Sequence, residues 1–231
     1  MKNSLAASLL ASLALVACGG GGGDDDSGPV ASTASFPARA AYAAYISVPQ
    51  SDNFTVSGTC AGTATSTATA ATPATFEGTT GRSVSATITM NLPNCTPVST
   101  SATAVSYFDM TPSPIGFNAG AQGYGVVAGP PPAIPVSVRV GDNGVFSTLT
   151  TYSSSTKQTV TGSRVLSYTV TADTADTVIV TFIGKDFNTQ SQLTSTVQSA
   201  YRLTTAGVAT LIFIDIQAAQ TSTTHLRLTK N

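Results

Sequence analysis

The sequence contains no tryptophan, only one histidine and few charged residues, which make up 9% of its 231 positions. Soluble proteins carry roughly 25% charged residues. The formal net charge is −1, and the lysines and arginines stand singly along the chain. Nucleic-acid binding needs clustered positive charge, so we expect no nucleic-acid partner. The lack of tryptophan also weakens a sugar-binding interpretation. Tyr124, between two glycines, is either an exposed aromatic platform or a tyrosine that caps the core.

The motifs of nucleophilic and cofactor chemistry are missing as well. A serine hydrolase needs a nucleophile, a base and an orienting acid, and no Gly-x-Ser-x-Gly sequence occurs. Walker loops, dinucleotide-binding fingerprints and metal-ligand spacings are also absent. The three consecutive aspartates at 24–26 do not alternate with other residues as calcium ligands do. We therefore expect no cofactor and no metal, and we assign no catalytic residue.

Carboxylates are few in the body of the chain, which begins at about Phe36. They are Asp52, Glu77, Asp109, Asp142, Asp173, Asp176, Asp186 and Asp215. Turns account for three of them, at 142, 173 and 176. Asp186 is expected at a strand end beside Lys185. Glycoside hydrolysis by a pair of these acids stays open in principle.

Asp215 is one of two residues with a speculative functional role. It lies in an apolar run, in register with Leu211 and Phe213. A carboxylate there needs a hydrogen-bond partner. If the hairpin at Ala206-Gly207 has a simple register, Gln198 lies opposite Asp215 and can donate one. The alternatives are a satisfied acid near a strand end and a functional carboxylate.

His225 is the second speculative residue, because it is the only imidazole of the chain. Strand alternation places it on the same face as Arg227 and opposite Leu226 and Leu228. This pattern predicts a histidine on the solvent face. A role as a catalytic base is the alternative.

Two cysteines, Cys60 and Cys95, lie in the body of the chain. In an oxidising compartment, an isolated pair in a β-rich domain favours a disulfide. Zinc would require further thiol or imidazole ligands, and a catalytic cysteine would require a base. His225 is the only imidazole available for either role. The sequence therefore predicts a structural disulfide between Cys60 and Cys95.

The apolar residues of the body alternate with serine and threonine or form short β-branched runs, with turn residues about every ten positions. This pattern predicts an all-β fold: an antiparallel, meander-rich sandwich or barrel-like domain with little helix apart from the N-terminal leader. Only the Ala-rich segment Ala38–Ala44 indicates a short helical turn, before Pro49. The pattern leaves the choice between sandwich and barrel open.

Three segments carry more specific predictions. The Thr/Ser/Ala alternation of Thr63–Ala70 lacks bulk on either face and indicates a weakly packed strand at an edge. The apolar residues on either side of Asn143-Gly144 predict a hairpin, because this dipeptide supplies the positive φ angles of a tight turn. Leu211–Ile214 is apolar on both faces and predicts a central, covered strand.

The first 17 residues form a separate segment. Lys2 precedes the apolar stretch Leu5–Val16. As a helix, this stretch would span about 18 Å, too short for a hydrocarbon core of roughly 30 Å. It therefore indicates a signal peptide rather than a membrane span.

The end of this segment, Leu15-Val16-Ala17-Cys18, resembles the lipobox of bacterial lipoproteins. The resemblance implies cleavage before Cys18, a diacylglycerol thioether on its thiol and an acylated amine, which together form a lasting membrane anchor. In that family an Asp after the cysteine retains the protein in the inner membrane, so Gly19 implies the outer membrane. An ordinary secretory leader with an incidental cysteine is the alternative. The body resembles uncharacterised Gly-linker lipoproteins of Gram-negative bacteria, a likeness that transfers no site residues.

The predicted organisation is a signal peptide at 1–17, a lipidated Cys18 with a flexible Gly/Asp tether over 18–35, and one all-β domain over 36–231. A subdivision near residue 130 is an alternative. The leading functional hypothesis is a non-enzymatic accessory or interaction module at the outer membrane, facing the periplasm or the surface and binding a protein partner. The alternative is a barrel-type carrier or chaperone, with an interior cavity for a small apolar ligand lined by one face of the strands from Val136 to Ile216. A hydrolase centred on Asp215 or His225 is the third hypothesis.

Overall fold

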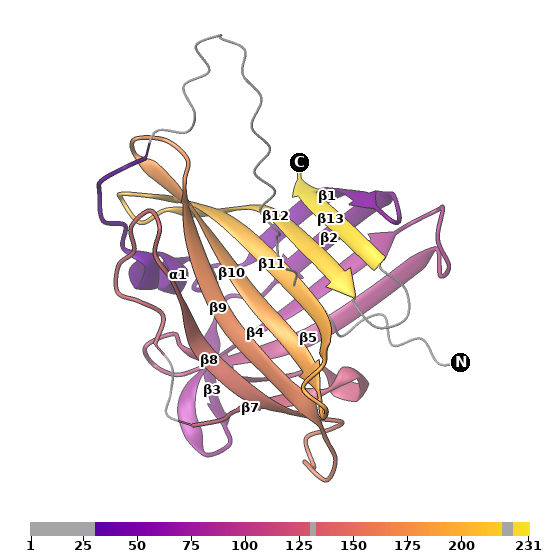
Figure 1. The fold of residues 1–231 in the computed structure, drawn as a ribbon. Helices are drawn as coiled ribbons and strands as arrows, with labels where there is room; N and C mark the ends of the chain where they lie inside the picture. Colours follow the sequence, from indigo (N-terminus) through magenta and orange to yellow (C-terminus); the bar gives the residue numbers. More distant parts are fainter. Residues whose placement is uncertain (1–30, 130–132, 219–223) are drawn as a thin grey trace.

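The computed structural model describes residues 31–129, 133–218 and 224–231, and these form 13 strands of one antiparallel sheet (Figure 1). The prediction of an all-β fold is confirmed. The helical elements are α1 (Ala38–Ile46) and one turn of 3-10 helix, η1 (Gly120–Gln122). The strands are β1 (Gln50–Gly58), β2 (Gly62–Ala68), β3 (Thr72–Phe76), β4 (Thr79–Asn91), β5 (Ser99–Phe108), β6 (Pro114–Asn118), β7 (Tyr124–Val127), β8 (Asn143–Tyr152), β9 (Val160–Ala172), β10 (Thr177–Asn188), β11 (Leu193–Thr204), β12 (Ala209–Ala218) and β13 (Thr224–Lys230).

The sheet closes on itself, because β2 pairs with β1 on one side and with the C-terminal part of β4 on the other. With β3 set aside, which pairs only with the N-terminal part of β4, the closed barrel has 12 strands. The prediction of an edge strand at Thr63–Ala70 is therefore wrong. Ala64 faces the interior between Phe54 and Met90, so neighbouring strands supply the bulk that β2 lacks.

The hairpin predicted at Asn143-Gly144 is also wrong. The turn lies earlier, where the backbone N–H of Arg139 donates to the Asp142 carboxylate at 2.8 Å. Both residues of the dipeptide already belong to β8, opposite Thr169 and Tyr168 of β9. A local turn built by an aspartate side chain has thus replaced the Asn-Gly turn. β7 and β8, on either side of residues 130–132, are neighbours in the same sheet.

The two ends of the barrel differ. At one end, here called the helix end, α1 lies beside the turns that join β5 to β6, β9 to β10 and β11 to β12 (Figure 1). At the opposite end, here called the mouth end, the turns join β6 to β7, β8 to β9 and β10 to β11. The predicted disulfide is present there, with the Cα atoms of Cys60 and Cys95 5.9 Å apart.

α1 packs into the helix end of the barrel. Its alanines give it helix propensity, and their small side chains let it approach the strands closely. Tyr42 makes edge contacts with Phe108 of β5, and Tyr45 does so with Tyr201 of β11. Because the two tyrosines reach different parts of the barrel wall, α1 forms a bridge across its interior.

The strands alternate between an apolar inner face and a polar outer face. On β4, Val84 and Met90 are buried in the interior. On the outer face, the Thr87 hydroxyl lies 2.8 Å from that of Thr103 on β5. The many threonines and serines of the sequence thus pair across strands on the outside, where most soluble proteins place charged residues.

Candidate functional site

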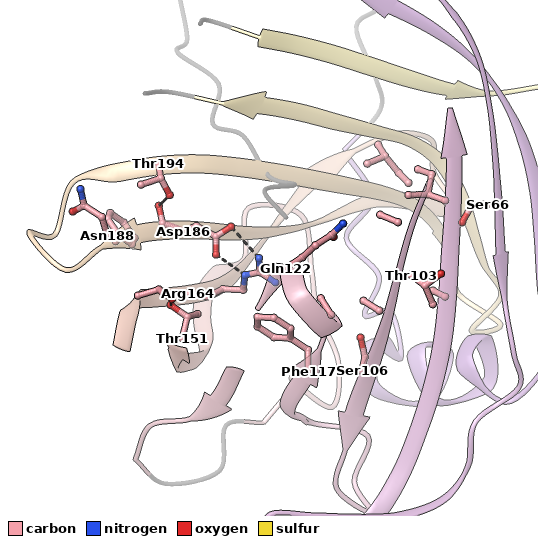
Figure 2. A pocket seen from close by; sticks show the side chains of 18 residues that line it. Ser66, Thr103, Ser106, Phe117, Gln122, Thr151, Arg164, Asp186, Asn188 and Thr194 are labelled. Atoms are coloured by element: carbon pink, nitrogen blue, oxygen red, sulfur yellow. Dashed lines mark hydrogen bonds and ion pairs between the residues drawn. The ribbon is translucent and has the colours of Figure 1, made fainter. Parts of the chain in front are cut away.

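A cavity of about 430 Å³ lies inside the barrel, toward the mouth end (Figure 2). Its wall is formed by residues of β2, β4, β5 and β6 on one side and of β8 to β12 on the other. Gln122 of η1 and Asn188 at the end of β10 lie at its rim. The carrier hypothesis predicted an interior cavity lined by the strands from Val136 to Ile216. The cavity exists, and the N-terminal strands contribute to its wall as well.

One wall of the cavity is mainly apolar, with the serines Ser66 and Ser106 among its alkyl side chains. Ala86 and Ile88 of β4 lie opposite Ala104 and Ala102 of β5, and all four face the cavity. Barrels of about eight strands are already wide enough to hold a small ligand. Methyl groups at these positions do not fill the wider interior of this barrel, and the cavity is the space that remains.

The facing wall carries a row of polar side chains on three adjacent strands. Arg164 of β9 lies directly opposite Asp186 of β10, which lies directly opposite Ser195 of β11. Arg164 donates from Nε to Asp186 Oδ1 at 2.6 Å and from Nη2 to Oδ2 at 3.0 Å. The hydroxyl of Ser195 donates to Oδ2 at 2.9 Å. Figure 2 shows the two-bonded ion pair projecting toward the cavity.

The aromatic ring of Phe117 packs against the Arg164 side of this ion pair. The guanidinium carbon of Arg164 lies 4.5 Å from the centre of the Phe117 ring, a cation–π contact. The ring itself lies over Gly125 of β7, where an added Cβ would stand only 2.2 Å from the ring atom Cε1. Gly125 is therefore required for the position of Phe117, and through Phe117 for that of Arg164.

Asp186 lies near the end of β10, as the sequence predicts. Its sequence neighbour Lys185 points to the opposite face of the strand, as neighbouring residues do. The partner of Asp186 is Arg164, 22 positions earlier in the chain. The turn at Asp173–Asp176, which the sequence does predict, already sets this register, because the strands on either side of it pair in order from Ala172 and Val178.

The structure brings the two speculative residues, Asp215 and His225, together on the outer face of the barrel. The Nε2 atom of His225 lies 3.0 Å from Asp215 Oδ2, and Arg227 Nη1 lies 3.6 Å from the same oxygen. Gln198 lies directly opposite Asp215, as the simple hairpin register predicted. His225 is half exposed while Leu226 is buried, which confirms the predicted alternation. The cluster lies outside the barrel and does not line the cavity.

One detail of the predicted register at Asp215 is wrong. The pairing of β11 with β12 shifts between Ala200, which lies opposite Phe213, and Tyr201, which lies opposite Leu211. This bulge turns Leu211 into the core, while Phe213 and Asp215 face outward. The run Leu211–Ile214 thus supplies both faces of a central strand. On the outer face, the guanidinium carbon of Arg227 lies 3.7 Å from the centre of the Phe213 ring.

Other charged groups form pairs away from the cavity. Tyr124 is buried and donates to Glu77 at 2.6 Å, so it caps a cluster of aromatic residues rather than forming an exposed platform. The ammonium group of Lys157, followed by this phenol, holds the pKa of Glu77 below its usual value. At the helix end, hydrogen bonds from Arg202 hold the pKa of Asp173 below its usual value.

The helix end of the interior holds its own polar group. Asp52 is buried and pairs with Lys230. Burial, with a further contribution from Asp52, raises the pKa of Tyr45 to about 12. Burial also raises the pKa of Tyr201 well above its usual value. Both phenols are therefore neutral at physiological pH and act as packing and hydrogen-bonding groups.

The described residues that line the cavity include no histidine, cysteine or lysine. The base that lies next to a hydroxyl at this wall is the Asp186 carboxylate, which accepts a hydrogen bond from Ser195 and two from Arg164. In the described parts of the chain, no three His, Cys, Asp or Glu side chains come close enough to hold a metal ion. Cys18 lies outside the described residues.

Comparison with known proteins gives no relative: no family model, curated protein or solved structure matches the chain. Within residues 31–129, 133–218 and 224–231, no helix combines the length and the apolar character needed to cross a membrane.

Proposed function

We propose that the protein binds and carries a small, mainly apolar molecule inside its barrel. The cavity of about 430 Å³ is the observation that carries this proposal. Ligand-binding cavities in proteins measure roughly 300–1,000 Å³ and combine an apolar lining with a few placed polar groups. The alanine wall on β4 and β5 and the polar row on β9 to β11 fit that description. The interaction-module hypothesis rests on the low charge, the missing catalytic motifs and the long linker of the sequence, and it has less support because none of these identifies a binding surface.

We also propose that Cys18 carries the lipid anchor. The first described residues lead into Phe36, which pairs with Val138 beside α1, so the tether joins the barrel at the helix end. The mouth end, with the cavity rim, then faces away from the attachment point. A ligand could enter or leave the barrel without passing the tether.

Filling the cavity tests the carrier function. We expect Ala102→Trp to weaken the binding of the neutral dye N-phenyl-1-naphthylamine at least about tenfold, because the indole would occupy the cavity. The measurement is a fluorescence titration of the dye. Ser101→Trp is the matched control, since Ser101 is the adjacent residue of β5 and its hydroxyl bonds Thr89 on the outer face.

Because the natural chain has no tryptophan, indole emission shows where each new side chain lies. Emission at shorter wavelength from Ala102→Trp than from Ser101→Trp places the first indole in the interior. Equal dye binding by the two variants, with this emission difference present, would refute the carrier function.

Replacement of Cys18 tests the anchor. We expect Cys18→Ser to move the protein from the membrane fraction to the soluble fraction of the cell envelope, because the variant has no thiol for diacylglycerol. Immunoblots of fractionated cells provide the measurement. Gly19→Asp is the control that keeps the lipid, and its expected result is relocation to the inner membrane. A Cys18→Ser protein that stays in the membrane fraction would contradict the proposed anchor.

A further inference from the structure

The ion pair of Arg164 and Asp186 accounts for all the charge that the described residues place on the cavity wall. Both carboxylate oxygens accept hydrogen bonds from the guanidinium group, and one of them accepts a further bond from Ser195. The side chains of Arg164 and Asp186 are only 20% and 14% exposed. The two charges therefore compensate each other at contact distance, and the wall has no net charge.

A charged ligand would meet no counter-charge in this cavity. Moving an ion out of water into an apolar site is costly unless an opposite charge and hydrogen bonds replace its hydration. An anion would have to compete with Asp186 for Arg164, and a cation would have to compete with Arg164 for Asp186. An uncharged group avoids both competitions.

Neutral hydrogen-bonding groups surround the ion pair. Gln122, Asn188 and Thr194 lie on the side of the cavity that holds the ion pair (Figure 2), and Thr161 also lines the cavity. The side chains of Thr161, Thr194 and Asn188 donate to Thr151, to the Asp186 carbonyl and to Gln192. The Gln122 amide and the hydroxyl oxygens of the two threonines therefore suit a ligand group that can donate or accept, such as a hydroxyl or an amide. The opposite wall is mainly alkyl, from Ala86, Ile88, Ala102 and Ala104, with the hydroxyls of Ser66 and Ser106 at its edges.

We propose that the ligand is an uncharged amphiphile: a hydrocarbon body against the alanine wall, with a hydroxyl, carbonyl or amide group beside the Arg164–Asp186 pair. This inference rests on the proposed carrier function. The cavity of about 430 Å³ corresponds to roughly 14 non-hydrogen atoms at about 30 Å³ each, the volume of a water molecule in the liquid. The part of the ligand that lies inside the barrel is thus a single short chain or a small ring system.

The test uses three probes with the same alkyl chain: octanol, octanoate and octylammonium. Each competes with N-phenyl-1-naphthylamine for the full-length protein at neutral pH. We expect octanol to bind at least about tenfold more tightly than either ion. Because any apolar cavity favours an alcohol to some degree, the charge variants of the pair supply the decisive comparison.

We expect Asp186→Asn to raise the affinity for octanoate about tenfold or more, because the substitution leaves Arg164 without its carboxylate. Arg164→Gln should raise the affinity for octylammonium in the same way. The double variant Arg164→Gln with Asp186→Asn is neutral again and should return to the preference for octanol. It also shows whether a weak response of a single variant is due to poor folding, since it leaves no unpaired charge in the interior.

Asp173→Asn is the matched control. Asp173 also holds an arginine through two hydrogen bonds, to Arg202 at 2.7 and 3.1 Å, but it lies at the helix end and does not line the cavity. The substitution changes the net charge of the protein as Asp186→Asn does. Its octanoate affinity should equal that of the wild type.

The outcomes separate the two proposals. If the wild type binds neither the dye nor any probe, the carrier function fails. If it binds the dye but prefers octanoate or octylammonium, the carrier function stands and the uncharged ligand is refuted. The uncharged ligand is also refuted if folded Asp186→Asn and Arg164→Gln proteins leave the order of the probes unchanged, or if Asp173→Asn raises octanoate affinity as much as Asp186→Asn does.

Discussion

Removing the disulfide by a Cys60→Ala and Cys95→Ala double substitution is expected to lower the free energy of unfolding by roughly 4 kcal/mol. The two cysteines are 35 positions apart, and the loop between them contains β2, β3 and β4. Without the cross-link, the unfolded chain gains the freedom of that loop. Alanine avoids placing an unpaired hydroxyl where Cys60 is buried, which serine would do.

Urea unfolding followed by circular dichroism measures this effect. Besides a lower midpoint, we expect a steeper dependence on urea, because an unfolded state without the cross-link exposes more surface. Reduction of the wild type is the control, since it opens the same bond without changing a side chain. An oxidised wild type and a double variant with the same midpoint would show that the cross-link does not stabilise the barrel.

This disulfide lies beside the pairing of β2 with β4, which closes the barrel and which the sequence did not predict. The alternation of Val84, Ile88 and Met90 predicts an inner and an outer face for β4, and the structure has both. Nothing within Thr63–Ala70 indicates that β2 joins β1 to β4, because its own side chains are small. Closure depends on the bulky side chains that flank Ala64 on the two neighbouring strands. These are Phe54 of β1 and Met90 of β4, which are far apart in the chain. The sequence therefore predicts the strands and leaves the barrel undecided.

The candidate site was predictable in part. The turn at Asp173–Asp176 fixes the register that sets Arg164 opposite Asp186. The inner face of β10 follows from Val178 and Val180, which share that face with Asp186 and are both buried. What the sequence does not contain is the cavity, since a cavity is a deficit of side-chain volume between strands whose distance is known only after closure.

Asp215 and His225 show the opposite case. Both were selected for their chemistry, and the structure places them 3.0 Å apart. Their position on the outer face, with Arg227 beside them, gives the carboxylate of Asp215 the partners that its apolar surroundings require. The satisfied strand-end acid is therefore a sufficient explanation of Asp215, and the charged pair that lines the cavity is that of Arg164 and Asp186.

Phe36→Ala is expected to lower the free energy of unfolding by about 3–5 kcal/mol, the usual cost of deleting a buried phenylalanine ring. Phe36 is 0% exposed and packs with Val138 and Val178 at the helix end. Its backbone exchanges two hydrogen bonds of 2.9 Å with Val138. The ring therefore fastens the segment that enters the barrel ahead of α1.

Val136→Ala is the matched control, because Val136 lies two residues before Val138, the partner of Phe36, and is 66% exposed. Its effect should stay within about 0.5 kcal/mol. Dye affinity of the folded Phe36→Ala protein should match that of the wild type, since the cavity lies toward the other end of the barrel. Unchanged stability would mean that the Phe36 cluster is not part of the cooperative core. A fall in both stability and dye affinity would mean that packing at the helix end supports the cavity. The loss of packing would then reach the cavity along strands that join the two ends, such as β10 from Val178 to Asp186.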